Sequence, residues 1–315
     1  MFAFKLDNSL SSKALQTICR WHPLAEKYNV CMHMYADDTQ LYVSFSADNG
    51  AYAKCRLEDC ITEIRQWMGK NHLKLNDSKT EFLVLGNPGI HSQIEGISSI
   101  SIGSTSVDAA ESAKNIGAVL DSQLTMAGHV SNVCRSCYMH LHQISQIRPY
   151  LTQDAAATIV HSLITSRLDY VNSLLYGLPE YLIKRLQLVQ NNAARLILRK
   201  RKHDSATPLL KSLHWLPVPQ RIEYKINLLT YKALNNLAPK YLSNLLVPYN
   251  PSRSLRSSTK GYLTEKKARL KKAGDRSFSV CGPKLWNKLP EIVSKSDSLE
   301  SFKVALKTHL FREAY

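Results

Sequence analysis

The segment "HMYADDTQLYVSF", His33 to Phe45, constrains the fold of this chain more than any other feature. Apolar residues alternate in "VCMHMY" and again in "LYVSF", which is the period of a β-strand with one buried face. Asp37 and Asp38 separate the two runs, so they fall at the tip of a predicted hairpin. Asp tolerates turn geometry well, but adjacent carboxylates are also the ligands that Mg²⁺ prefers. The residues alone leave open whether the pair is a polar turn or part of a metal site.

Hydrophobic periodicity predicts an α+β chain that becomes helical after about residue 122. The helical period of residues 51–71 is followed by a turn and a strand from Glu81 to Leu85, with further short strands in "ISSISIG" and "KNIGAVLD". Residues 25–122 are therefore predicted to be mixed, 123–250 helical, and 251–315 a basic arm with a final helix. Residues 1–24 show no clean period, and "WHP" is interpreted as a break. The later helical faces lie at 130–147, 154–168, 182–198, 222–233 and 299–311.

The charge balance favours a polyanionic partner. The chain has 41 Lys and Arg against 25 Asp and Glu, a net charge of +16, which suits nucleic acid or an acidic membrane surface. The sequence contains no run of about 18 apolar residues, so no membrane span is predicted. The opening "MFAFKLDNSL" is too short and too soon charged for a signal peptide, and the odd number of scattered cysteines is typical of reduced thiols. We expect an intracellular protein, with nucleus or cytoplasm undecided.

Two basic clusters indicate where phosphates could be neutralised. The first, between Tyr181 and His203, has no acidic residue, and the second lies between Arg253 and Arg276. The alternative is a solvated basic surface, and "LRKRK" also fits the loose pattern of a nuclear import signal. Four aromatic residues could stack on bases or fill a core: Trp215, Tyr224, Tyr231 and Trp286. The predicted nucleic-acid-binding residues are Lys184, Arg185, Arg195, Arg199, Lys200, Arg201 and Lys202.

The segment "CRSC" offers a second metal hypothesis. Cys134 and Cys137 would share one face of a helix, with His129, His140 and His142 nearby in the sequence, which invites a zinc site. No second pair of ligands is well spaced to close it, and small buried thiols are common in cores. Both interpretations stay open.

The hairpin and the blocks after it resemble one family. "YADDTQLY", with strands on both sides, resembles the catalytic hairpin of reverse transcriptases from non-LTR (LINE-type, jockey-like) retrotransposons. "WMGKNHLKLNDSKTEFLVLG" resembles that family's next block and "KNIGAVLD" its primer-grip block. "TSRLDYVNSLLYGLP", "LQLVQNNAARLIL", "LHWLPVPQRIEYKINLLTYKAL" and "GDRSFSVCGPKLWNKLP" resemble its thumb and C-terminal region. The resemblance covers residues 25–315 and implies a partial polymerase palm followed by a helical thumb.

The resemblance also implies roles for particular residues. Asp37 corresponds to the aspartate that ligates both Mg²⁺ ions, and Asp38 to its less directly coordinating neighbour. Lys79 would protonate the departing pyrophosphate, although it could equally be a solvated turn lysine. Tyr35 and Ala36 would lie beside the primer terminus. Asn115, Ile116 and Gly117 would form the primer grip, for which the alternative is a bulge in a strand, and the implied partners are RNA and DNA as a primer–template.

Departures from the family bear on activity. In the family a first aspartate block and a glycine-containing, nucleotide-binding block precede the aspartate pair, whereas 36 residues precede Asp37 here. Asp7 is the sole early candidate for a third carboxylate, and it lies too near in sequence to leave room for the missing block. We therefore expect a truncated, C-terminal part of an RNA-directed DNA polymerase, a nucleotidyltransferase, that does not polymerise DNA by itself. The alternative is a non-catalytic nucleic-acid-binding protein derived from the retrotransposon.

Overall fold

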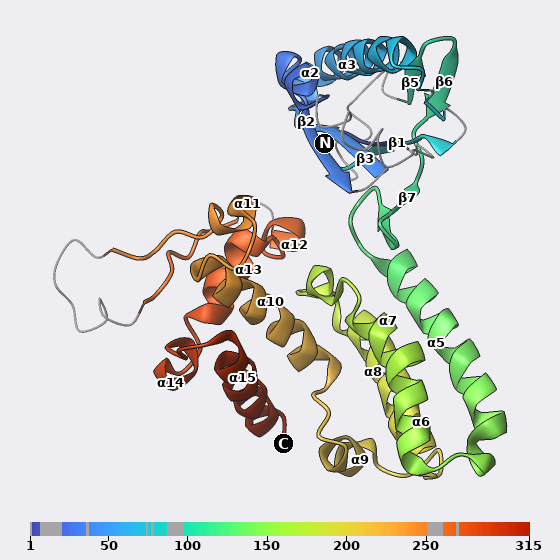
Figure 1. The fold of residues 1–315 in the computed structure, drawn as a ribbon, viewed down its shortest axis with the longest axis vertical. Helices are drawn as coiled ribbons and strands as arrows, with labels where there is room; N and C mark the ends of the chain where they lie inside the picture. The colour runs from blue at the N-terminus through green and yellow to red at the C-terminus, as the bar shows by residue number, and fades with distance from the viewer. Residues whose placement is uncertain are drawn as a thin grey trace. The chain divides into compact units, whose positions relative to one another are not determined.

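A computed structural model describes residues 2–6, 21–35, 38–73, 75–76, 79–86, 98–250, 261–268 and 271–315. Ala36, Asp37, Asp7 and residues 251–260 and 269–270 of the basic segment lie outside the described residues. The chain divides into two compact units, residues 1–129 and 130–315, each with its own core. Figure 1 shows the order of the elements along the chain. The mixture of helices with small antiparallel sheets confirms the predicted α+β class.

The first unit is built on a four-stranded antiparallel sheet. Its strands are β1 (Phe2–Leu6), β2 (Cys31–Tyr35), β3 (Asp38–Val43) and β4 (Glu81–Val84), in the spatial order β2-β3-β1-β4. Helix α2 (Trp21–Lys27) connects β1 to β2, and α3 (Gly50–Lys70) follows the short 3₁₀ helix η1 (Ala47–Asn49) and leads toward β4. This is the β-α-β-β-α-β arrangement of a split βαβ fold. The helices therefore pack on one face of the sheet, and the opposite face is not covered by them.

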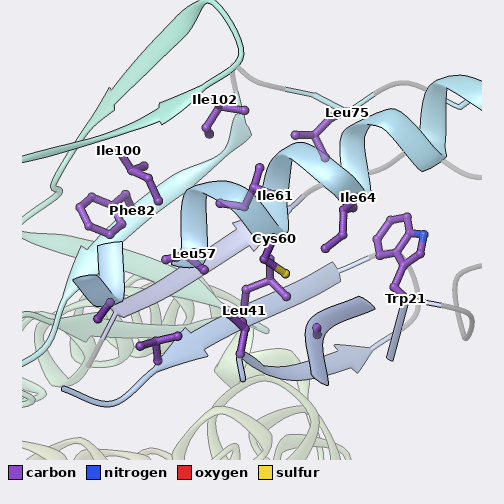
Figure 2. Close-up of a cluster of buried hydrophobic side chains, with 14 of the residues drawn as sticks. Trp21, Leu41, Leu57, Cys60, Ile61, Ile64, Leu75, Phe82, Ile100 and Ile102 are labelled. Carbon is purple, nitrogen blue, oxygen red and sulfur yellow. The ribbon is translucent and has the colours of Figure 1, made fainter. Parts of the chain in front are cut away.

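Helix α3 forms the core of this unit with the sheet. Its apolar residues recur with the helical period, and Leu57, Cys60, Ile61, Ile64 and Met68 are all buried. Figure 2 shows several of them above the strands, together with the strand residues Leu41 and Phe82. Burial of each large aliphatic side chain stabilises the fold by about 1.5–3 kcal/mol. The predicted amphipathic helix is thus confirmed, and it fixes which face of β3 points inward.

Two elements near the N-terminus were not predicted. β1 lies between β3 and β4, although residues 1–24 were interpreted as lacking a period. The segment "WHP" does not break the structure, because α2 begins at Trp21 and places Pro23 in its first turn, where proline removes no helical hydrogen bond. Trp21 is fully buried and meets Trp67 edge to face, with 5.9 Å between the ring centroids. An aromatic contact that is distant in sequence therefore orders this helix.

Two β-hairpins complete the first unit. They are β5 (Ser99–Ile102) with β6 (Thr105–Asp108), and β7 (Ser112–Asn115) with β8 (Ala118–Asp121). After β8, the carboxylate of Asp121 accepts hydrogen bonds from the backbone N–H groups of Gln123, Thr125 and Met126. These bonds order the turn that precedes helix α5.

The second unit is helical, as the sequence predicts. Every end of the five predicted helices lies within four residues of the observed end. The observed helices are α5 (Ala127–Ile147), the continuous run α6 (Gln153–Val160), η4 (His161–Thr165) and α7 (Ser166–Asp169), α8 (Glu180–Ile197), α10 (Val218–Leu234) and α15 (Leu299–Ala314). The η4 segment is a π-helix. Shorter elements lie between them: η3 (Arg148–Tyr150), η5 (Asn172–Leu175), α9 (Ala206–Ser212), α11 (Lys240–Ser243), α12 (Lys271–Gly274), α13 (Phe278–Trp286) and α14 (Glu291–Ser294).

Helices α10, α13 and α15 lie side by side around an aromatic core (Figure 1). Tyr231 stacks on Phe302 with 4.2 Å between centroids, and Trp286 lies 5.9 Å from Phe302. Tyr231, Trp286 and Trp215 are almost fully buried. Tyr231 and Trp286 therefore belong to the core, Trp215 is also buried but borders a cavity, and Tyr224 is half-buried.

Candidate active site and nucleic-acid interface

The β2–β3 hairpin has the register that the alternating pattern predicts. Tyr35 pairs with Asp38 and His33 with Gln40, so residues 36 and 37 form the connection between the strands. Asp38 is the first residue of β3 and is half-buried, while Asp37, the expected principal metal ligand, lies outside the described residues. The predicted hairpin is confirmed, and one carboxylate of the pair is placed.

Asp38 belongs to the face of the sheet that α3 does not cover. Thr39, Leu41 and Val43 are buried, whereas Asp38 and Gln40 alternate with them and point to the other face. Cross-strand partners share a face, so Tyr35 lies beside Asp38 on this open side, where 63% of its surface is exposed. The open face thus presents a carboxylate, an amide and an aromatic ring to solvent.

The β7–β8 hairpin reaches the same face. Gln40 donates a hydrogen bond from Nε2 to Oδ1 of Asn115 at 2.5 Å, which joins β3 to the last residue of β7. Ile116 and Gly117 form the turn with φ angles of 42° and 78°, so this is a tight two-residue turn and not the bulge considered from the sequence. A β-branched residue is strained at positive φ, and strained backbone clusters at functional sites. Asn115, Ile116 and Gly117 are therefore adjacent to the strand that carries Asp38.

Lys79 lies at the same end of the sheet as Asp38. β1 pairs with both neighbours, placing Leu6 opposite Thr39 and Lys5 opposite Glu81. Lys79 precedes Glu81 by two residues, is exposed, and donates its backbone N–H to the carbonyl of Asn76 at 3.2 Å. Two strand spacings of about 4.8 Å put the β3 and β4 backbones about 10 Å apart at this end. A lysine side chain is long enough to reach toward Asp38 across that distance.

Of the two carboxylates that the sequence analysis expects to bind Mg²⁺, Asp38 lies among the described residues. Carboxylate oxygens are the donors that Mg²⁺ needs, so Asp38 is chemically suitable. Among the described residues, no group of three or more His, Cys, Asp or Glu side chains is placed to hold a metal ion. Asp7 follows β1 directly in the sequence, and β1 is the strand between Asp38 and Lys79. The periodicity of the sequence did not predict that β1 pairs with β3 and β4.

The cysteines of "CRSC" pack into the core of the second unit. Cys134 and Cys137 are both buried on one side of α5, and burial raises the pKa of Cys137 to about 11. His140 contacts Gln143 and His142 contacts Gln146, each within its own helical turn. Within the described part of the chain, these residues form no metal-binding group. The contacts favour the core interpretation of the two thiols over the zinc hypothesis.

The first basic cluster separates into structural and exposed members. Arg195 donates from Nε and Nη2 to the carbonyl of Asp204 at 3.0 and 2.9 Å, and Arg199 donates to the carbonyls of Arg148, Pro149 and Leu151. Lys184 pairs with Glu180 at 2.9 Å, and Arg185 donates to Ser131 at 3.1 Å. Three residues that follow α8 are exposed, and their side chains form no ion pair within the described residues: Lys200, Arg201 and Lys202.

Arg148 is a structural residue that sequence reasoning missed. Its guanidinium is buried and donates to the carbonyls of Leu196, Ile197 and Leu151 at 2.9, 2.6 and 2.7 Å. The carbonyls of Leu196 and Ile197 belong to the last turn of α8, where a cation is stabilising. Arg148 and Arg199 thus hold the helix end from which the exposed Lys200–Lys202 segment projects.

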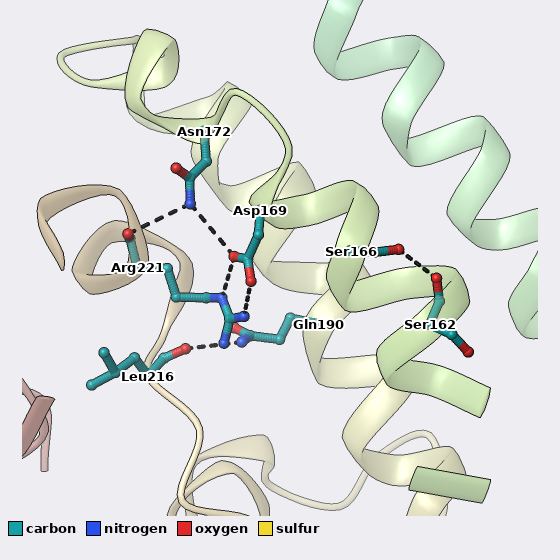
Figure 3. A network of polar contacts seen from close by, with 7 residues as sticks. All are labelled: Ser162, Ser166, Asp169, Asn172, Gln190, Leu216 and Arg221. Carbon is teal, nitrogen blue, oxygen red and sulfur yellow. Dashed lines mark hydrogen bonds and ion pairs between the residues drawn. The ribbon is translucent and has the colours of Figure 1, made fainter. Parts of the chain in front are cut away.

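A polar network holds the start of α10 against α7. Arg221 donates through Nε to Oδ1 of Asp169 at 2.7 Å and through Nη2 to Oδ2, and Asn172 contacts the same carboxylate (Figure 3). Gln190 of α8 donates to the carbonyl of Leu216 at 2.9 Å in the same region. Asp169, Asn172 and Arg221 of this network also line a cavity.

None of the described helices is long and apolar enough to cross a membrane.

No protein-family model and no solved structure matches the chain. The chain is 26% identical over 248 residues to the probable RNA-directed DNA polymerase from transposon BS of Drosophila melanogaster, which covers 74% of this chain and 25% of that protein. The chain therefore spans about a quarter of the length of the curated relative that it matches. The chain is thus distantly similar to part of a transposon RNA-directed DNA polymerase.

Proposed function

We propose that this chain is the end of the palm, the thumb and the C-terminal region of a LINE-type, RNA-directed DNA polymerase. The observation that carries the proposal is the open face of the four-stranded sheet. Asp38 lies on it beside Tyr35, Asn115 is hydrogen-bonded to it through Gln40, and Lys79 lies at the same end. The distant similarity to a transposon polymerase supports the same function.

The proposed roles are those that the family resemblance implies for these residues. Asp37 and Asp38 would hold Mg²⁺, which when bound lowers the pKa of a primer hydroxyl and stabilises the leaving pyrophosphate. Lys79 would deliver a proton to the pyrophosphate from its end of the sheet. Tyr35 and Ala36 would contact the primer terminus, and the β7–β8 turn at Asn115, Ile116 and Gly117 would hold the primer backbone.

We propose further that the chain by itself binds a primer–template without extending the primer. Phosphoryl transfer through two metal ions requires more carboxylate donors than the aspartate pair provides. Asp38 is the hairpin carboxylate among the described residues, and Asp37 and Asp7 lie outside them. Removal of essential groups from such a site removes most of the rate enhancement.

Mn²⁺ binding tests the metal role of the hairpin without requiring activity. Electron paramagnetic resonance of Mn²⁺ added to the chain with a primer–template should show bound ion, and Asp37→Asn with Asp38→Asn should abolish that signal. Asp48→Asn is the matched control, because Asp48 is an exposed acid of the same unit away from the hairpin. Unchanged Mn²⁺ binding in the hairpin variant, or an equal loss in Asp48→Asn, would contradict the proposal.

The second candidate function is a nucleic-acid-binding protein without catalysis. The exposed Lys200, Arg201 and Lys202 favour it, because phosphate neutralisation needs no carboxylate site. In that case the hairpin substitutions leave binding of the primer–template unchanged with and without divalent ions. Under the first proposal, divalent ions tighten the complex and the hairpin substitutions remove that gain.

A further inference from the structure

A cavity in the second unit has a lining unlike the open sheet face. It measures about 430 Å³ and lies between α10, the π-helical segment η4, the 213–217 connection and α15. Cavities of about 300–1,000 Å³ are the size of small-ligand sites. Its lining includes His161, His214, Trp215, Arg221, Lys225 and Lys307.

The charge of the lining is positive. Among the described residues that line the cavity, Asp169 is the one acid, and Arg221 binds both of its oxygens. Lys225 and Lys307 form no ion pair within the described residues. Burial lowers the pKa of His161, and the cations of Arg221 and Lys307 lower it further against the opposing effect of Asp169. The two free lysines leave a positive field that suits an anion.

Arg221 is held ready to bind that anion. Its Nε and Nη2 atoms each donate one hydrogen bond to Asp169. Three of the five N–H groups of Arg221 therefore lack an acceptor among the described residues. Lys225 lies one helical turn further along α10, on the same side of the helix. A fixed guanidinium next to a mobile ammonium is a good arrangement for binding phosphate oxygens.

The remaining wall is aromatic and its backbone is unusual. Trp215 and Tyr224 line the cavity, and His161 meets Trp215 edge to face at 5.3 Å between centroids. His161 and Thr165 belong to the π-helix, a rare conformation that is frequent at functional sites. His214 has a φ of 52°, a conformation that costs energy for a residue with a side chain. A flat ring could be accommodated against this wall while cations bind a phosphate.

We infer that this cavity binds a nucleoside phosphate, with Arg221, Lys225 and Lys307 on the phosphate and Trp215 and Tyr224 beside the base. The ligand could be a free nucleotide or the phosphorylated end of a strand, since both present the same chemistry. The inference rests on the cavity alone and does not require the aspartate hairpin to hold a metal ion.

Isothermal titration of the full chain with AMP, adenosine and inorganic phosphate tests this inference. AMP should bind at least about tenfold more tightly than either adenosine or phosphate, because each lacks one half of the ligand. Lys225→Glu should weaken AMP binding about tenfold or more, since it replaces a cation at the phosphate by an anion. Lys225→Ala should weaken it less and guards against misfolding of the charge reversal.

Lys232→Glu is the matched control, because Lys232 lies two turns further along α10 and does not line the cavity. It should leave AMP binding unchanged. The inference fails if AMP does not bind, if inorganic phosphate binds as tightly as AMP, or if Lys232→Glu weakens AMP as much as Lys225→Glu does. A short oligonucleotide with a 5′-phosphate that displaces AMP identifies a strand end as the source, and one that fails to displace it identifies the free nucleotide.

Discussion

Ile116 is a residue at which strain should be measurable. It has a φ of 42° in the β7–β8 turn, where an Asn-Gly pair is the favoured sequence. Ile116→Asn should raise the free energy of unfolding of the first unit by about 1 kcal/mol, because asparagine accepts the left-handed conformation that costs a β-branched residue about 1–2 kcal/mol. Urea denaturation measures the change.

Gly117→Ala should change the free energy of unfolding in the opposite direction to Ile116→Asn. Gly117 has a φ of 78°, so an added Cβ should lower stability by about 1 kcal/mol. If Ile116→Asn destabilises the unit while Gly117→Ala is neutral, the two-residue turn described here is wrong.

The thiols should differ sharply in reactivity. Cys31 and Cys55 are exposed, whereas burial raises the pKa of Cys60 to about 12 and that of Cys281 to about 11. Alkylation at pH 8 followed by peptide mass spectrometry should label Cys31 and Cys55 first, because the thiolate is the reactive form. Rapid labelling of Cys60 or Cys281 in the native chain would contradict their burial.

The same pKa values predict how stability depends on pH. The folded thiols of Cys137 and Cys281 keep their protons up to about pH 11, while ordinary thiols release theirs near pH 9.0. The folded state therefore binds more protons than the unfolded state in this window, and the free energy of unfolding falls as pH rises from about 9 to about 11. Replacement of Cys137 and Cys281 by alanine should flatten that fall in pH-dependent denaturation.

At the residue scale, the sequence predicted the local strands better than the contacts between residues that are distant in the chain. The alternation around Asp37 and Asp38 predicted which strands flank the pair, since a period of two is visible in short runs. It could not show that Asn115 approaches Gln40, which is 75 residues away, because contacts distant in sequence have no periodic signal. Likewise Arg195 and Arg199 were grouped with exposed cations, although backbone carbonyls hold both.

At the element scale, Arg148 is expected to stabilise the end of α8. Its guanidinium donates to three carbonyls while buried, so Arg148→Ala should lower the free energy of unfolding by about 2 kcal/mol or more. Thermal or urea denaturation followed by far-UV circular dichroism measures the loss.

Lys184→Ala on the same helix is the control for that substitution. Lys184 and Glu180 are both well exposed, and such pairs contribute about 0.5 kcal/mol or less. Equal losses for Arg148→Ala and Lys184→Ala would show that Arg148 does not cap the helix.

The elements themselves were largely predictable, with instructive exceptions. Long helices with a strong apolar period, such as α8 and α10, were found near their observed ends. β1 was missed because five residues carry too little pattern, and its position between β3 and β4 depends on pairing with strands more than 30 residues away. The π-helix η4 was also missed, because a helix period cannot distinguish it from the α-helix around it.

At the scale of the whole molecule, the excess of positive charge should produce salt-dependent binding. Reversal of Lys200, Arg201 and Lys202 to glutamate should weaken binding of an RNA–DNA duplex and reduce the salt slope by about 2–3, because each phosphate contact contributes about 0.9. Fluorescence anisotropy across a salt series gives both values.

Lys295→Glu serves as the control for that experiment, since Lys295 pairs with Glu291 at 3.0 Å on a different helix. It should change the slope little. An unchanged slope in the triple variant, or affinity that does not fall with rising salt, would contradict phosphate contact at the end of α8.

The most direct test of the account is a single primer-extension experiment on an RNA template, in which complex formation and incorporation are measured together with Mg²⁺ or Mn²⁺. The account predicts that the chain binds the primer–template and adds no nucleotide. Incorporation that Asp37→Ala abolishes, or the absence of any complex at low salt, would contradict it.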